Sequence, residues 1–111
     1  MEPIVFLYVT APDDAAARRI AEALVEGRLA ACVNILPRIR SVYRWKGEIE
    51  RADEAAMIVK TTAARAVAAR ALIQSLHPYE TPTIAALAVD AERSGEKFVG
   101  WIASETMETI S

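Results

Sequence analysis

The chain has 111 residues, a length that predicts a single domain over residues 1–111 with its own hydrophobic core. Its 13 basic and 15 acidic side chains nearly balance, which argues against a basic surface for nucleic acid or anionic membranes. No apolar run approaches the roughly 20 residues that span a bilayer, the N-terminus lacks the basic start of a signal peptide, and the single cysteine predicts a reducing, cytoplasmic location.

The first segments of the chain predict a strand followed by a helix. The stretch PIVFLYVT (3–10) is apolar on both faces, which is typical of a buried strand. Asp13 or Asp14 can cap the helix that follows, and Gly27 is a suitable stop. The apolar stripe of this helix consists of Ala17, Ile20, Ala21, Leu24 and Val25.

The middle of the chain predicts a long β-hairpin. LAACVNIL (29–36) forms a strand that Pro37 interrupts and IRSVYRW (39–45) resumes. KGE (46–48) is a turn, and AAMIVKTT (55–62) is the returning strand. Because proline cannot donate a hydrogen bond to a strand ladder, Pro37 predicts a bend or bulge at a sheet edge.

The last segments predict a helix, a strand and a closing helix. Thr61 or Thr62 can cap the first of these helices, which ends near His77 because a residue before proline avoids the α region. TIAALAV (83–89) is a strand, and EKFVGWIASETM (96–107) is a helix. The predicted apolar face of the helix after Thr62 consists of Val67, Ala71, Leu72 and Leu76.

This order of elements predicts an α+β fold, a ferredoxin-like split βαβ sandwich with two helices on one face of an antiparallel sheet. The arm from Leu29 to Trp45 would stretch to roughly 50 Å at about 3.3 Å per residue, whereas a compact domain of this length is about 35 Å across. The hairpin therefore bends at Pro37 or projects beyond its domain. Its apolar tip, with Val42 and Tyr43, favours cover by neighbouring subunits. The alternative is a hairpin folded back on its own sheet.

The assembled segments resemble the CutA family, known as divalent-cation tolerance proteins. The matching stretches are LAACVNI (29–35), SVYRWKGEIE (41–50), IVKTT (58–62), LHPYETPTI (76–84) and WI (101–102). The resemblance implies a PII-like homotrimer built by extended hairpins, an association with copper and other divalent metals, and a cytoplasmic location in bacteria. The pattern departs over residues 90–97, and Phe98 stands where the family often has a tyrosine.

Three side chains are candidate metal ligands. The thiolate of Cys32 suits Cu(I), the imidazole of His77 suits borderline metals, and the carboxylate of Glu80 is a harder oxygen ligand. Each has a structural alternative. Cys32 can be a small core residue, and His77 can cap the C-terminus of a helix. Glu80 belongs to the HPYETP segment, which can be a rigid connection between helix and strand. The chain has no CxxC or HxxxH cluster, so one subunit supplies at most three ligands.

The resemblance implies that these residues gather near clefts between subunits with Trp45, Lys60, Tyr79 and Trp101. The expected function is divalent-cation tolerance by a homotrimer that binds copper or other divalent ions, with no required cofactor. The alternative is a PII-like trimeric signalling or scaffold module that binds a small metabolite or a partner protein. An enzyme is not expected, because phosphate loops, HExxH and GxSxG are absent; a Cys32–His77 nucleophile pair is the third alternative.

Overall fold

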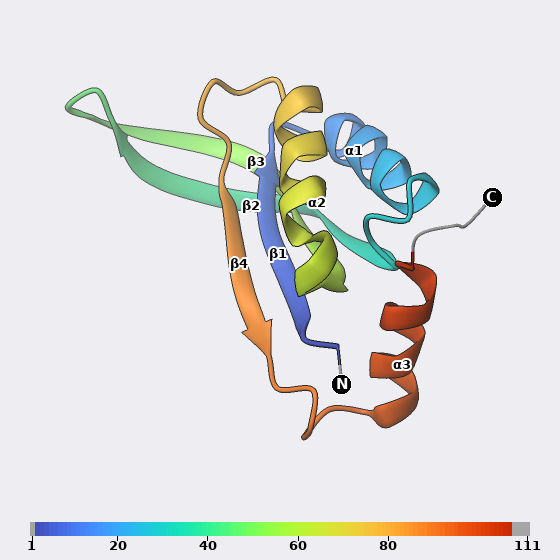
Figure 1. Ribbon diagram of the computed structural model, residues 1–111. Coiled ribbons are helices and arrows are strands. Elements are labelled where there is room, and N and C mark those ends of the chain that lie inside the picture. The colour runs from blue at the N-terminus through green and yellow to red at the C-terminus, as the bar shows by residue number, and fades with distance from the viewer. Residues whose placement is uncertain (1, 108–111) are drawn as a thin grey trace.

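A computed structural model describes residues 2–107 of the chain. One four-stranded antiparallel sheet has the order β2-β3-β1-β4, and three helices accompany it (Figure 1). This arrangement confirms the predicted α+β, ferredoxin-like sandwich. Among the helices of the described part, none has the length and apolar character needed to cross a bilayer. The elements are β1 (Ile4–Ala11), α1 (Asp14–Glu26), β2 (Cys32–Trp45), β3 (Glu48–Thr62), α2 (Ala63–Leu76), β4 (Ile84–Val89) and α3 (Glu96–Glu105).

Helices α1 and α2 cover one face of the sheet and form the main core with it (Figure 1). The predicted cap of α1 is confirmed at Asp13, whose Oδ1 accepts a hydrogen bond from the backbone N–H of Ala16 at 2.8 Å. The predicted stripe is buried at four positions, while Val25 is exposed. The core side chains of the sheet include Leu7, Val9, Met57 and Val59.

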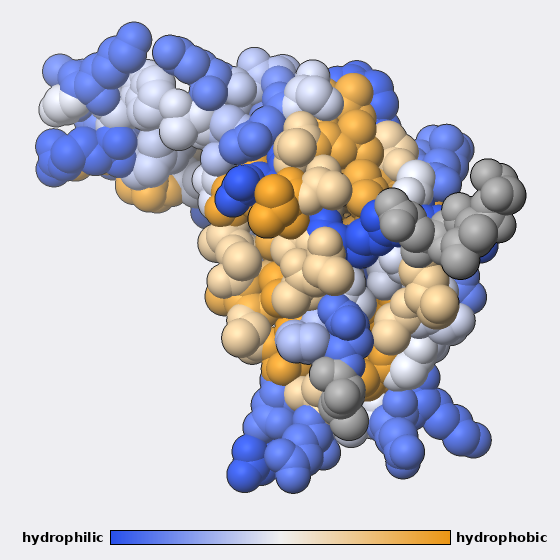
Figure 2. Space-filling view, in the orientation of Figure 1, coloured by the Kyte–Doolittle hydropathy of each residue, from blue (hydrophilic) through white to orange (hydrophobic). Residues whose placement is uncertain are grey.

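The apolar face predicted for α2 was partly wrong. Val67 is 63% exposed and Ala71 is also exposed, whereas Ala69 and Ile73 face the core. Because α2 carries alanine on every side, its periodicity does not single out one face. Apolar residues accordingly gather at the surface over α2 and the neighbouring β4, whereas most of the hairpin surface visible in this view is hydrophilic (Figure 2).

The N-terminus of α2 also differs from its prediction. Thr62 occupies the capping position, but its side chain makes no capping hydrogen bond. The hydroxyl of Thr61 instead donates to the carbonyl oxygen of Leu29 at 2.7 Å. That bond ties the chain just before β2 to the end of β3. The C-terminus of α2 is confirmed at His77, which is extended ahead of Pro78.

Helix α3 covers only one end of the opposite face of the sheet. Val99 and Ile102 of α3 pack there against Ile4. Directly opposed residues of an antiparallel pair share a face, so the rest of this face can be read from the register. We call it the open face, and its central residues are Tyr8, Asn34, Leu36, Ile58, Ala85 and Leu87. Leu87 is 54% exposed and Leu36 is also exposed.

The hairpin is longer and more regular than predicted. Strand β3 begins at Glu48, not at residue 55, because pairing with β2 holds a charged segment that has little strand propensity of its own. Lys46 and Gly47 form the turn with φ angles of 50° and 82°. Positive φ at both positions is the geometry of a two-residue type I′ hairpin turn. Strand β2 begins at Cys32, three residues later than predicted.

The prediction of a bulge at Pro37 is confirmed. Strand β2 lies at the sheet edge, and the register shifts between Leu36, which pairs with Ala56, and Ile39, which pairs with Glu54. Two residues of β2 therefore oppose one of β3, which is the pattern of a β-bulge and bends the strand. Because of this extra residue, the odd-numbered residues after the bulge share the open face with the even-numbered residues before it.

The hairpin projects from the body of the domain (Figure 1). The longest dimension of the described chain is 46 Å, and its Cα radius of gyration is 14.7 Å. A compact domain of this length has a radius of gyration of about 13 Å, which is smaller than the value for this chain. The predicted projecting arm is thus present, and it bends at Pro37 as well.

Candidate functional site

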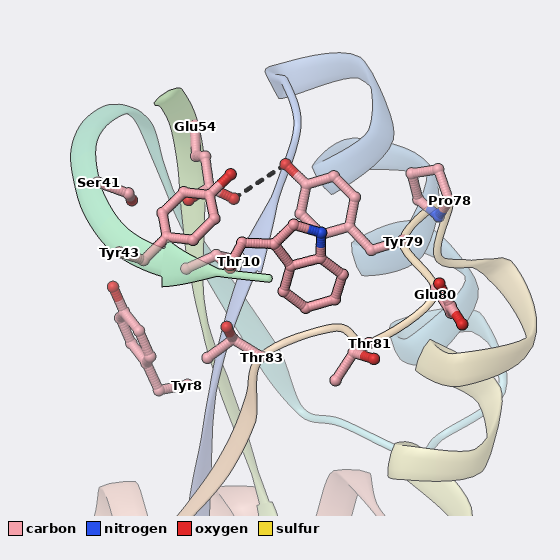
Figure 3. Close-up of a pocket in the computed structure, with 11 residues that line it drawn as sticks. Tyr8, Thr10, Ser41, Tyr43, Glu54, Pro78, Tyr79, Glu80, Thr81 and Thr83 are labelled. Carbon is pink, nitrogen blue, oxygen red and sulfur yellow. Dashed lines mark hydrogen bonds between the residues drawn. The ribbon is translucent and has the colours of Figure 1, made fainter. Parts of the chain in front are cut away.

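A pocket of about 700 Å³ lies where the hairpin faces the loop between α2 and β4 (Figure 3). The hairpin contributes side chains of the open face from both of its strands, and the loop contributes the segment after His77. Strand β1 forms the floor. The lining residues are Tyr8, Thr10, Ser41, Tyr43, Trp45, Glu54, Pro78, Tyr79, Glu80, Thr81 and Thr83. The bulge at Pro37 thus precedes the three β2 residues that enter the pocket.

His77 stands behind this pocket and holds two segments together. It is only 8% exposed. Its Nε2 lies 2.6 Å from the carbonyl oxygen of Thr10, and its Nδ1 accepts a hydrogen bond from the backbone N–H of Tyr79 at 3.1 Å. A carbonyl can only accept, so these partners assign the proton to Nε2 of a neutral ring. Both ring nitrogens are occupied, and His77 can bind a metal only after one of these hydrogen bonds breaks.

Tyr79 connects His77 to a buried carboxylate. Its ring lies 4.9 Å from the His77 ring, centroid to centroid, at 48°. Its hydroxyl donates to Oε2 of Glu54 at 2.9 Å (Figure 3). Desolvation, the hydrogen bond to Glu54 and the negative charge of Glu54 together raise the pKa of Tyr79 to about 12. The path from Thr10 through His77 and Tyr79 to Glu54 positions one wall of the pocket.

We expect Tyr79 to ionise about two pH units above an ordinary tyrosine. Absorbance at 295 nm, recorded for the wild type and for Tyr79→Phe, isolates this titration as a difference that rises near pH 12. The folded state holds the proton more tightly than the unfolded state, so Tyr79 stabilises the fold below about pH 10 and this contribution is lost between about pH 10 and 12. A difference titration centred near pH 10 would contradict the Tyr79–Glu54 contact.

The pocket brings together three of the predicted site residues, Trp45, Tyr79 and Glu80. Cys32 is half-buried on the edge strand β2, where it pairs in register with Lys60 on the face that α3 partly covers. Trp101 is exposed on α3.

Lys60 is held by aromatic rings. Its Nζ lies 5.9 Å from the ring centroid of Phe6 and 5.5 Å from that of Phe98. Phe98 stands at the position where the family often has tyrosine, and here its ring face receives the ammonium. Lys60 and Glu80 do not form one of the ion pairs of the described residues.

The predicted metal ligands do not converge in one chain. Within residues 2–107, no three His, Cys, Asp or Glu side chains are grouped so as to hold a metal ion. Nδ2 of Asn34 donates a hydrogen bond to the Cys32 sulfur at 3.9 Å. Metal binding by Cys32, His77 and Glu80 therefore stays a prediction.

Two important residues of the pocket were missed from the sequence. Glu54 falls in the charged segment that was not predicted to be a strand, and Thr10 accepts from His77 only through its backbone. Glu54 would have been found from the register alone: once β3 is extended to the turn, the pair that contains Glu54 and the pair that contains Tyr43 fall on one face, with three pairs of the ladder between them.

Comparison with known proteins gives a consistent result. The family model described as CutA1 divalent ion tolerance protein matches residues 5–105. The divalent-cation tolerance protein CutA of Archaeoglobus fulgidus is 47% identical over 103 residues, which cover 93% of this chain and 97% of that protein. Protein CutA of Mus musculus is 41% identical over 104 residues, and there the chain spans only 57% of the relative's length.

The solved structures agree with the sequence matches. The crystal structure of the divalent ion tolerance protein CutA1 from Ehrlichia chaffeensis superposes with a TM-score of 0.90 at 39% identity, covering 97% of this chain and 99% of that one. The similarity thus extends over the sheet, all three helices and the hairpin. The chain belongs to the CutA1 family of divalent ion tolerance proteins.

Proposed function

We propose that this protein is a cytoplasmic homotrimer that contributes to divalent-cation tolerance by binding copper or other divalent metal ions weakly at clefts between subunits. Family membership supports the tolerance function. The relatives are named as tolerance proteins and not as enzymes, which supports a binding role without catalysis. The CutA structure from Archaeoglobus fulgidus is named periplasmic. Fractionation of the native host tests the cytoplasmic location proposed for this chain.

The open face supports assembly into a homotrimer. A sheet needs a partner on each of its apolar faces, and α3 covers only one end of this one. Leu36 and Leu87 are exposed there. Apolar groups exposed side by side favour association with another copy. The free edge of β2 adds unpaired backbone groups that a second copy can satisfy.

Cys32 is the soft ligand best placed for metal binding in such an assembly. It lies on the edge strand and is only half-buried, so a second copy can bring further ligands to its sulfur. Glu80 is exposed and free to supply an oxygen. His77 is the least available of the three, because both of its nitrogens are hydrogen-bonded. The proposed site therefore requires more than one chain.

Calorimetric titration with Cu(I), Cu(II) and Zn(II) tests the metal site. We expect Cys32→Ala to weaken Cu(I) binding at least about tenfold, because thiolate is the preferred ligand of this soft ion. Glu80→Gln should affect Zn(II) and Cu(II) more than Cu(I). Ser41→Ala, a change of similar size on the same strand, is the matched control. Unchanged Cu(I) binding in Cys32→Ala would remove Cys32 from the site.

A second candidate function is favoured by the pocket between the hairpin and the loop after α2. Its volume of about 700 Å³ falls within the range of small-molecule sites. A trimeric signalling or scaffold module of the PII type would bind a small metabolite there, or a partner protein. This function predicts that Cys32→Ala still binds the small molecule. The metal function predicts that the same variant binds Cu(I) more weakly.

A further inference from the structure

Glu54 is a buried carboxylate that has no cationic partner among residues 2–107. It is 8% exposed, and its hydrogen bond within the described residues comes from the neutral hydroxyl of Tyr79. The ion pairs of the described part do not include it. Buried charges in proteins are normally paired, because an unpaired one loses its hydration without compensation. Glu54 therefore provides a negative site that a bound cation would satisfy.

Three aromatic side chains line the same pocket as this carboxylate. Tyr43 enters the pocket from the hairpin, and Tyr79 enters it from the loop after α2 (Figure 3). Trp45 of the hairpin lines the pocket as well. All three keep exposed surface. The negative face of an aromatic ring attracts cations, most strongly when water is excluded. Several rings around one carboxylate are the arrangement that holds organic ammonium groups.

The charge of the pocket has a single sign. Its lining residues within the described chain include two carboxylates, Glu54 and Glu80, and no lysine or arginine. The carboxylate of Asp13 adds to the negative field at the Tyr79 hydroxyl. Nζ of Lys46 in the hairpin turn lies 5.8 Å from the ring centroid of Trp45. Lys46 is not part of the lining, and it shows that this ring accepts a cation.

A small metal ion fits this pocket poorly. A divalent ion needs several oxygen, nitrogen or sulfur ligands at about 2 to 2.6 Å, and the described residues provide no such cluster. A lining of rings and hydroxyl groups around one buried carboxylate suits a larger and weakly hydrated cation. The hydroxyls of Ser41, Thr81 and Thr83 can accept hydrogen bonds from polar groups carried by the same ligand.

We propose that this pocket binds a small organic ammonium cation, with Glu54 as its counter-ion and the rings of Tyr43, Trp45 and Tyr79 as its cage. The inference names the ligand class for the second candidate function, on which it rests, and it does not depend on metal binding.

Choline and its uncharged carbon analogue, 3,3-dimethyl-1-butanol, test this directly because they have nearly the same shape. The full chain carrying Trp101→Phe reports through the fluorescence of Trp45. We expect saturable quenching or enhancement by choline, and binding of the neutral analogue at least about tenfold weaker. Glu54→Gln keeps an acceptor for the Tyr79 hydroxyl but removes the charge, and it should weaken choline binding about tenfold. Asp53→Asn is the matched control, because Asp53 is exposed and pairs with Arg38 instead.

The outcomes separate the ligand class from the functions proposed above. Equal affinity for the two probes, or full choline binding by Glu54→Gln, would overturn the cation while leaving a small-molecule site. If neither probe binds, the inference is overturned too; a lysine or arginine of a second copy filling the pocket would give this result. Choline binding that persists in Cys32→Ala is expected, and metal titration of the same samples judges the metal function independently.

Discussion

Leu87→Glu is expected to convert the assembled protein into single chains. Leu87 is the most exposed large apolar residue identified on the open face, and assembly would bury a carboxylate from each copy there. An unpaired buried charge costs about 3 kcal/mol or more. Lys60 lies in the same row of the sheet but two strands away, about 10 Å, which is too far for a direct ion pair. Sedimentation should show a shift to the 12.1 kDa chain mass.

The matched control for this change is the next residue of the same strand. Ala88 is also exposed, but it pairs with Val5 on the helical face of the sheet. Ala88→Glu introduces the same charge and the same loss of strand propensity, and we expect its mass in solution to remain that of the wild type. Circular dichroism should show that both variants keep their secondary structure. Dissociation by both variants, or by neither, would argue against an interface on the open face.

His77→Ala is expected to destabilise the fold by about 3 kcal/mol while leaving Cu(I) affinity unchanged. The change leaves the carbonyl of Thr10 and the N–H of Tyr79 without their partners, and each unsatisfied buried group costs about 1 to 3 kcal/mol. Tyr79 would also lose the ring that supports it. Urea denaturation at one fixed protein concentration measures this loss, since assembly makes stability depend on concentration.

Two further variants make the His77 experiment specific. In His77→Asn the side-chain oxygen can still accept from the N–H two residues on, so we expect a smaller loss than in His77→Ala. Ser75→Ala removes an exposed hydrogen bond of a residue two positions earlier, in the last turn of α2, and should cost little. A His77→Ala protein as stable as Ser75→Ala, with Cu(I) binding lost, would identify His77 as a metal ligand and not as a structural support.

Much of the fold followed from local patterns in the sequence. Strand β1 and helix α1 have strong periodicity and clear boundaries, and the bulge followed from the missing N–H of Pro37. The first half of β3 did not follow, because the charged segment from Glu48 to Glu54 becomes a strand only by pairing with β2. The core face of α2 did not follow either, because alanine on every side leaves the choice to packing.

The candidate site was predictable in part. The stiff HPYETP segment marked the place of the pocket, and the resemblance implied that Trp45 and Tyr79 gather near a cleft between subunits. The role of His77 depended on Thr10, which is 67 residues away and contributes a backbone carbonyl that sequence cannot reveal. Glu54 depended on a strand register that becomes known only when the turn is placed and β3 is extended to it.

The central claim is that an exposed sheet face and a projecting hairpin make this chain assemble and thereby form its clefts. Sedimentation equilibrium of the wild type at about 1 μM tests it most directly. The account predicts one species at three times the 12.1 kDa chain mass. A stable species at 12.1 kDa under these conditions would contradict it.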